Sequence, residues 1–171
     1  RVRCVALLLA DERVDPNLPD SKRNTPLNVA AYYGRDRCVE LLLADPRVDP
    51  NLADSVKGQT PLYIAANKGI GECVALLLAD PRVDPNHRDE HGRTPLWTAS
   101  NMGRDRCVEV LLADPRVDPN LVDGTGCTPL WTASNQGENR CVELLLADPQ
   151  VDLNLADSQG NTPLNVAANT G

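Results

Sequence analysis

The sequence contains no phenylalanine, and aromatic residues make up only 3% of its 171 residues. Hydrophobic residues still reach 42%, so a core has to be built from leucine, valine, alanine and cysteine, which suits thin, closely spaced helices. The net charge is −7, and the basic surface with which a nucleic-acid-binding protein neutralises phosphates is therefore not expected. An anionic membrane surface is disfavoured for the same reason. No apolar run approaches the roughly 20 residues of a membrane span, so we predict neither nucleic acid nor membrane as a partner.

The residue patterns of catalytic and metal-binding sites are also scarce in this sequence. Histidine occurs only at His87 and His91, in a loop where a surface position is favoured over a metal site. The Asp-rich stretches lack the glycine turn and closing glutamate of a calcium loop, and their arginines favour a solvated charge ladder instead. No nucleophile–histidine–acid set and no phosphate-binding glycine loop can be assembled. We therefore predict no catalytic residue, no metal, no cofactor and no enzyme activity.

What the sequence does contain is a repeat. The stretch RCVEVLLADPRVDPN from Arg106 recurs nearly unchanged from Arg3, Arg37, Glu72 and Arg140, and its cysteines lie 34, 35, 34 and 34 residues apart. A Thr-Pro-Leu phrase interleaves at the same period, from Thr25, Thr60, Thr94, Thr128 and Thr162. A fixed period of this length indicates stacked supersecondary units, each in contact only with its neighbours.

Each unit predicts two short helices. Thr25 is suited to cap the first helix, Pro26 fits its first turn, and Gly34 supplies a left-handed residue at its end. The second helix is apolar over most of its circumference and must be packed on both sides. We expect Asp36 to be its N-cap, and we expect it to end near residue 44 because a proline follows at position 46.

Five of the six cysteines share one position of the second helix. Neighbouring helices pack about 8–10 Å apart, whereas a disulfide needs Cα atoms within about 7 Å. The cysteines are therefore expected to stay reduced and to act as small apolar side chains in an intracellular, cytoplasmic protein. Cys127 lies outside this ladder among polar residues, and we expect it to be the readily alkylated thiol.

The pattern T-P-L-x-x-A-[AS]-x-x-G, then C-V-x-[LV]-L-L, a D-P-N turn and a D-x-x-G-x-T loop resembles the ankyrin repeat over essentially the whole chain. The resemblance implies an all-α repeat solenoid of stacked antiparallel helix pairs with β-hairpin or loop fingers. The expected units are a half repeat at 1–19, repeats at 20–53, 54–88, 89–122 and 123–156, and a half repeat at 157–171. Arg23 stands where the family has a finger glycine, which leaves the turn type of the first finger open.

Ankyrin repeats similar to these are non-catalytic scaffolds that bind proteins through the finger tips and the concave face of the first helices. The resemblance therefore implies a protein partner of unknown identity. The expected finger contacts are Ser21, Lys22, Asn24, Lys57, Gln59, Glu90, His91, Arg93, Thr125, Cys127, Gln159 and Asn161. The expected groove contacts are Tyr32, Tyr33, Asn67, Lys68, Asn101, Met102, Asn135 and Gln136. These positions differ between units while the flanking scaffold does not.

Three aromatic residues occupy the position of the family's histidine after Thr-Pro-Leu. They are Tyr63, Trp97 and Trp131. Packing between repeats, with each indole N–H bonded to a carbonyl, is favoured over a stripe of binding residues.

The two ends of the sequence suggest an alternative function. The sequence begins with a second helix and ends with a first helix, and the joined ends would parallel the residues around Gly69. The alternative is a structural, self-assembling protein that stacks head-to-tail into filaments or rings, because such a contact is heterologous.

Overall fold

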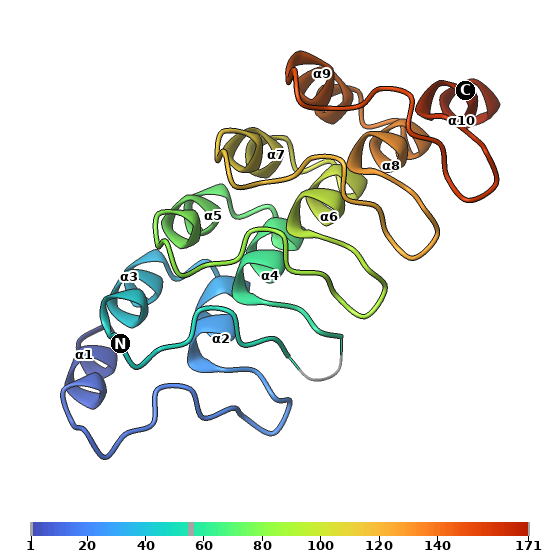
Figure 1. Ribbon diagram of the computed structural model, residues 1–171. Coiled ribbons are helices and arrows are strands. Elements are labelled where there is room, and N and C mark those ends of the chain that lie inside the picture. Colours follow the sequence, from blue (N-terminus) through green and yellow to red (C-terminus); the bar gives the residue numbers. More distant parts are fainter. Residues whose placement is uncertain (1, 55–56, 171) are drawn as a thin grey trace.

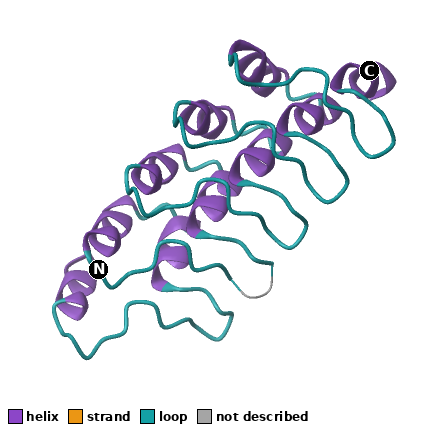
Figure 2. Cartoon of the chain, in the orientation of Figure 1, coloured by secondary structure: helices purple, strands orange, loops and turns teal. Residues whose placement is uncertain are grey.

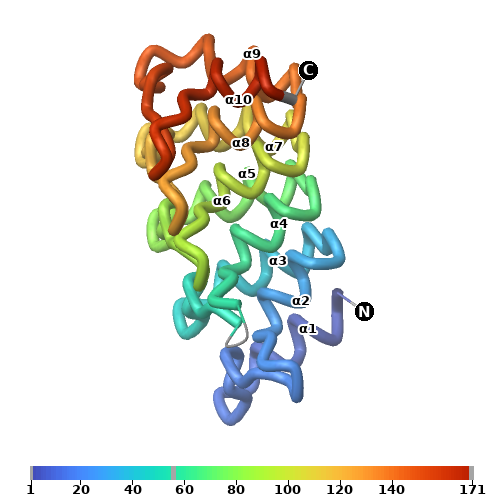
Figure 3. The backbone as a smooth tube through the Cα atoms, turned by 90° about the vertical axis from the view of Figure 1, so that its right-hand side faces the viewer, coloured from blue at the N-terminus to red at the C-terminus, as the bar shows by residue number. Residues whose placement is uncertain are grey.

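The computed structural model describes residues 2–54 and 57–170, which form a stack two helices wide (Figure 1). The first helices of the repeats make one row: α2 (Pro26–Tyr32), α4 (Pro61–Lys68), α6 (Pro95–Asn101), α8 (Pro129–Gln136) and α10 (Pro163–Thr170). The second helices make the other row: α1 (Val2–Leu9), α3 (Asp36–Ala44), α5 (Gly71–Leu78), α7 (Asp105–Leu112) and α9 (Asn139–Ala147). Each inner helix contacts both neighbours in its row and its partner in the other row. The chain advances steadily from one end of the stack to the other (Figure 3).

The first helices begin as predicted from the Thr-Pro phrase. The hydroxyl oxygen of Thr94 accepts a hydrogen bond from the backbone N–H of Trp97 at 3.1 Å, and Thr128 does the same for Trp131 at 3.0 Å. The proline that follows each threonine occupies the first turn, where no N–H partner is needed. Gly34, with a φ of 60°, takes the predicted left-handed conformation after Tyr33, the C-cap of α2.

The second helices differ from the prediction at their start. The N-cap of α3 is Arg35, which makes no side-chain cap, and Asp36 is the first helical residue. Asp36 lies inside the helix and does not cap it. Its carboxylate instead accepts a hydrogen bond from the thiol of Cys73 in the next repeat, at 3.1 Å. Asp105 accepts from Cys141 in the same way at 3.2 Å. The predicted end of α3 at Ala44 is confirmed.

The core runs between the two rows and consists of the predicted residue types. Leu27, Leu62 and Leu96 of the first helices are at most 1% exposed. Cys73, Cys107 and Cys141 of the second helices are fully buried, as expected of small apolar side chains. Burial raises the pKa of the Cys107 thiol to about 11.

The fingers are loops and not β-hairpins, because no strand is present in the described parts of the chain (Figure 2). Each finger is closed by an aspartate: the Asp89 carboxylate accepts from the backbone N–H groups of His91 and Arg93, both at 2.9 Å. Neighbouring finger tips share single backbone bonds, such as Gly124 N–H to the His91 carbonyl at 2.8 Å. A single bond between two fingers is too few for a strand ladder.

The three aromatic residues that follow Thr-Pro-Leu pack between repeats, as predicted. The indole N–H of Trp97 donates to the Cys127 carbonyl at 3.1 Å, and that of Trp131 donates to the Asn161 carbonyl at 3.1 Å. Tyr63 is 2% exposed, and burial raises its pKa to about 12. Each of these rings therefore fills a gap in the stack.

Candidate functional site

A hollow of about 390 Å³ lies on the finger side of the stack, where the first two fingers meet α2 and α4. We call it the lysine groove. Its lining residues are Lys22, Asn24, Tyr32, Asp54, Lys57, Gln59, Ile64, Asn67 and Lys68. Seven of these nine were predicted as partner contacts, and the structure brings them together from both fingers and both helices. Asp54 and Ile64 were missed, because the aspartate closes a finger and the isoleucine follows a core pattern.

Lysine is concentrated in this groove. Lys22, Lys57 and Lys68 are the only lysines in the chain, and all three line the same hollow. In the described residues, the ion pairs use arginine or histidine as the cation, and none of them includes a lysine ammonium. The groove is therefore a positive surface in a chain of net charge −7.

Two exposed tyrosines stand beside the groove. Tyr32 and Tyr33 are 47% and 60% exposed, and their rings meet edge to face with centroids 5.0 Å apart. The ammonium of Lys68 lies 4.1 Å from the centre of the Tyr32 ring. A second hollow, of about 410 Å³, adjoins the first and includes Lys22, Asn24 and both tyrosines. An extended surface thus runs from the finger tips to the end of α2.

Other predicted contacts have partners within the fold. Arg93 pairs with Asp89 at 2.7 Å and lies over the Trp97 ring. Burial alone would raise the pKa of Asp89, but the bonds from the Arg93 guanidinium and the finger N–H groups outweigh it, and the pKa is lowered. The side-chain oxygen of Asn101 accepts hydrogen bonds from Thr132 at 2.8 Å and from Gln136 at 3.1 Å, and both donors belong to the next repeat.

The remaining predicted contacts lie on the later fingers and first helices. Glu90 and His91 are exposed on the third finger and Thr125 on the fourth, while Met102 follows α6. Ser21 on the first finger and Gln159 and Asn161 on the fifth are also exposed, whereas Asn135 near the end of α8 is half-buried.

Cys127 corrects one expectation. Its side chain is 6% exposed, and its Sγ lies 3.3 Å from the Thr125 hydroxyl, so it is not the readily accessible thiol. The finger folds back over α6, where Trp97 bonds the Cys127 carbonyl, and this contact buries the thiol. All six cysteines are among the described residues and are free, and the exposed one is Cys4.

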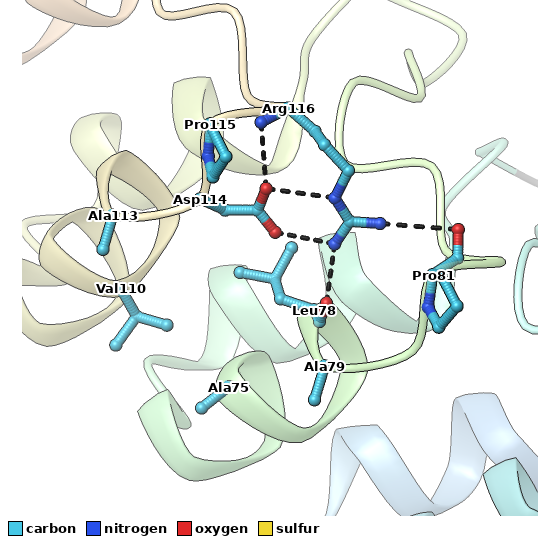
Figure 4. A pocket seen from close by; sticks show the side chains of 9 residues that line it. All are labelled: Ala75, Leu78, Ala79, Pro81, Val110, Ala113, Asp114, Pro115 and Arg116. Carbon is cyan, nitrogen blue, oxygen red and sulfur yellow. Dashed lines mark hydrogen bonds and ion pairs between the residues drawn. The ribbon is translucent and has the colours of Figure 1, made fainter.

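The second-helix row carries a feature that the sequence analysis missed. The Arg116 guanidinium binds Asp114 at 2.6 Å and also donates to the carbonyl of Leu78, the last residue of α5, at 2.6 Å (Figure 4). Arg82 donates likewise to Leu43 near the end of α3, and Arg47 to Leu9 at the end of α1, both at 2.7 Å. We call these residues the arginine ladder. The arginines are therefore not simply solvated, because each satisfies a helix-end carbonyl of the preceding repeat.

An asparagine ladder runs parallel to the arginines. Asn86 donates to the Arg116 carbonyl at 2.7 Å and accepts from the Asp118 N–H at 2.9 Å. Asn51 makes the same two bonds to Arg82 and Asp84. These side-chain amides bond each loop that follows a second helix to the equivalent loop of the next repeat. We therefore conclude that the second-helix side stabilises the stack.

Neither metal-binding nor membrane-spanning features emerge from residues 2–54 and 57–170. They contain no group of three His, Cys, Asp or Glu side chains that could hold a metal ion. Their helices are too short or too polar to cross a membrane.

Short helix pairs repeated about every 34 residues define the molecule as an α-helical repeat solenoid. A family model described as three copies of the ankyrin repeat matches residues 46–123 and 113–171, and one described as many copies matches residues 7–55. The chain therefore belongs to the ankyrin repeat family. No curated protein matches it. Ankyrin repeats are generally protein-binding modules and are typically non-catalytic.

Proposed function

We propose that this chain is a non-catalytic scaffold that binds a protein partner through its finger tips and the concave face of its first helices. The observation that carries the proposal is the exposed pair Tyr32–Tyr33 beside the lysine groove. These are two of only five aromatic residues in the chain, and the other three are packed between repeats. Exposed tyrosines next to a hollow are typical of the residues that dominate binding energy at protein interfaces.

The distribution of sequence differences supports the same surface. Apart from Asp54, which recurs in every finger, the positions lining the lysine groove differ between repeats, whereas the arginine and asparagine ladders recur in successive repeats. Recurring residues serve contacts that every repeat makes. The variable positions on the finger side are free to serve one partner. A reducing, cytoplasmic location is part of the proposal, since all six cysteines are free thiols.

The proposal is tested by comparing what three forms of the chain capture from an extract of the source cells. The forms are the wild type, a Tyr32→Ala, Tyr33→Ala variant, and a Leu43→Ala variant altered in the second-helix row. We expect a specific protein to be retained by the wild type and by Leu43→Ala and to be lost from the tyrosine variant. Equal retention by all three forms would contradict binding at the finger side.

A second candidate function is head-to-tail self-association, in which α10 of one chain would pack beside α1 and α2 of the next. A hollow of about 620 Å³ beside α1 and α2, lined in part by Val5 and Val29, would receive a first helix.

Light scattering after size exclusion distinguishes the two candidates. Head-to-tail stacking predicts a mass that climbs with concentration without a plateau at the dimer, and a Leu164→Glu variant that stays monomeric. A wild-type chain that is monomeric at every concentration would remove this candidate and leave partner binding.

A further inference from the structure

We propose that the lysine groove binds an acidic segment of the partner, an extended stretch carrying several aspartate or glutamate side chains. The inference rests on the proposed function, because it specifies the chemistry of the partner at the same surface. Lys22 comes from the first finger, Lys57 from the second and Lys68 from the last residue of α4. Three separate elements thus bring all the lysines of the chain to one place.

The balance of charge in the groove is opposite to that of the chain. Its lining includes three lysines and one aspartate, Asp54, while the chain as a whole carries −7. Asp54 is 8% exposed, and its carboxylate accepts the backbone N–H of Lys57 at 2.7 Å. Asp20 in the adjoining hollow accepts from the N–H groups of Lys22 and Asn24 at 2.8 and 2.9 Å. Both carboxylates keep their charge, but Asp54 is buried and Asp20 lies only in the adjoining hollow, so the lining of the lysine groove itself has an excess of two positive charges.

The lysines are positioned without being neutralised. The contact of Lys68 with the Tyr32 ring holds its ammonium at the groove by a cation–π attraction, which leaves the positive charge in place. Lys22 and Lys57 take part in none of the ion pairs between described residues. An ammonium group is a compact charge with three donors and binds a carboxylate in many orientations.

The other lining residues favour a peptide over a small anion. The side-chain amides of Asn24, Gln59 and Asn67 each offer donors and an acceptor, which suit the N–H and C=O groups of an extended backbone. The exposed Tyr32 supplies an apolar surface for the side chains between the acidic ones. An extended segment in which acidic side chains alternate with apolar ones would contact the lysines, the amides and the tyrosine of the groove.

A displayed library of short random peptides is the probe, because it contains both charge signs and no phosphate. Peptides selected against the wild type are synthesised with a fluorescent label and titrated by fluorescence anisotropy. The test variant carries Lys22→Gln, Lys57→Gln and Lys68→Gln. The matched control carries Arg37→Gln, Arg106→Gln and Arg140→Gln, which removes the same charge from exposed positions of α3, α7 and α9.

We expect the selected peptides to be rich in Asp and Glu and the lysine variant to weaken their binding by about tenfold, with the arginine control unchanged. Selected peptides without acidic residues, or equal loss in the control, would overturn the inference. If binding is lost in the Tyr32→Ala, Tyr33→Ala variant but not in the lysine variant, the inference fails and the proposed function stands. If no finger-side substitution affects any peptide, both fail. The selected peptides are also titrated in the presence of inorganic phosphate. If they lack acidic residues and phosphate displaces them from the groove, the groove binds phosphate and not carboxylate, and the inference is overturned.

Discussion

The ammonium of Lys68 lies 4.1 Å from the centre of the Tyr32 ring, which joins the end of α4 to the end of α2 across a repeat boundary. Both residues are exposed, and neither belongs to the recurring contacts that hold the stack together. The pair therefore orders the finger-side surface with little effect on the core. An exposed cation–π contact contributes about 0.5–1 kcal/mol, so variants at these positions can be assayed for binding on folded protein.

The arginine ladder predicts opposite effects at two equivalent positions. Arg82→Gln should lower the free energy of unfolding by about 1–2 kcal/mol, because the carbonyls of Leu43 and Val48 lose charged donors. Position 150 carries glutamine, whose side chain makes no hydrogen bond within the described residues, so Gln150→Arg should raise stability by about 1 kcal/mol. Urea unfolding followed by circular dichroism measures both.

The control for the ladder is Arg13→Gln. Arg13 is exposed and its hydrogen bonds go to Asp11 in its own turn. Its replacement should leave the free energy of unfolding nearly unchanged, because an exposed ion pair contributes little. A loss as large as that of Arg82→Gln would show that the inter-repeat carbonyl bonds are not the source of the effect.

The first finger carries local backbone strain at Arg23. Its φ is 64°, the left-handed region that glycine occupies at Gly92, Gly126 and Gly160 in later fingers. A left-handed residue with a side chain costs about 1–2 kcal/mol, and glycine loses about 0.5–1 kcal/mol in entropy. Arg23→Gly should therefore raise the thermal midpoint, by an amount equivalent to about 0.5–1 kcal/mol.

The reverse change in a later finger is the matched test. Gly126→Ala would place a Cβ 2.8 Å from the Ser158 nitrogen at a φ of 85°, and it should cost more than about 1 kcal/mol. Two variants that shift the midpoint in the same direction would contradict this explanation.

Much of the fold could be predicted because each repeat contains local sequence signals for the ends of its own helices. Thr-Pro starts a helix by local hydrogen bonding, and an Asp-Pro sequence ends one by local sterics, so neither depends on the neighbouring repeat. The bonds of Asp36 to Cys73 and of Arg116 to Leu78 do depend on the stacking register, and one repeat read alone does not reveal them. The lysines were predicted singly as contacts. Their meeting in one groove required the structure, because they come from three elements.

Acid should destabilise the third finger through Asp89. Burial opposes ionisation of this carboxyl, but its bonds with Arg93 and the finger N–H groups outweigh that and lower its pKa in the folded state. A lowered folded pKa contributes stability that is complete above the unfolded value of about 4 and is lost as the pH falls through the folded value. Unfolding free energies between neutral pH and acid should therefore fall less steeply for Asp89→Asn than for the wild type. Identical slopes would contradict a role for this carboxylate.

Thiol reactivity should follow burial along the stack. Cys4 is exposed and Cys38 half-buried, whereas burial, followed by the bond to Asp36, raises the pKa of Cys73 to about 12. Iodoacetamide labelling of the native protein at mildly alkaline pH should modify Cys4 first and leave Cys73, Cys107 and Cys141 protected. Burial also raises the pKa of Cys127. Labelling of Cys127 as fast as Cys4, measured by peptide mass spectrometry, would be inconsistent with the buried thiol.

Hydrogen–deuterium exchange with the captured partner bound and unbound tests the central claim most directly. Binding at the finger side predicts slower exchange at residues 20–34 and 57–69, which contain the first two fingers and the ends of α2 and α4, with α3, α5 and α7 unchanged. Slower exchange confined to α3, α5 and α7 would place the partner on the second-helix row and contradict the account.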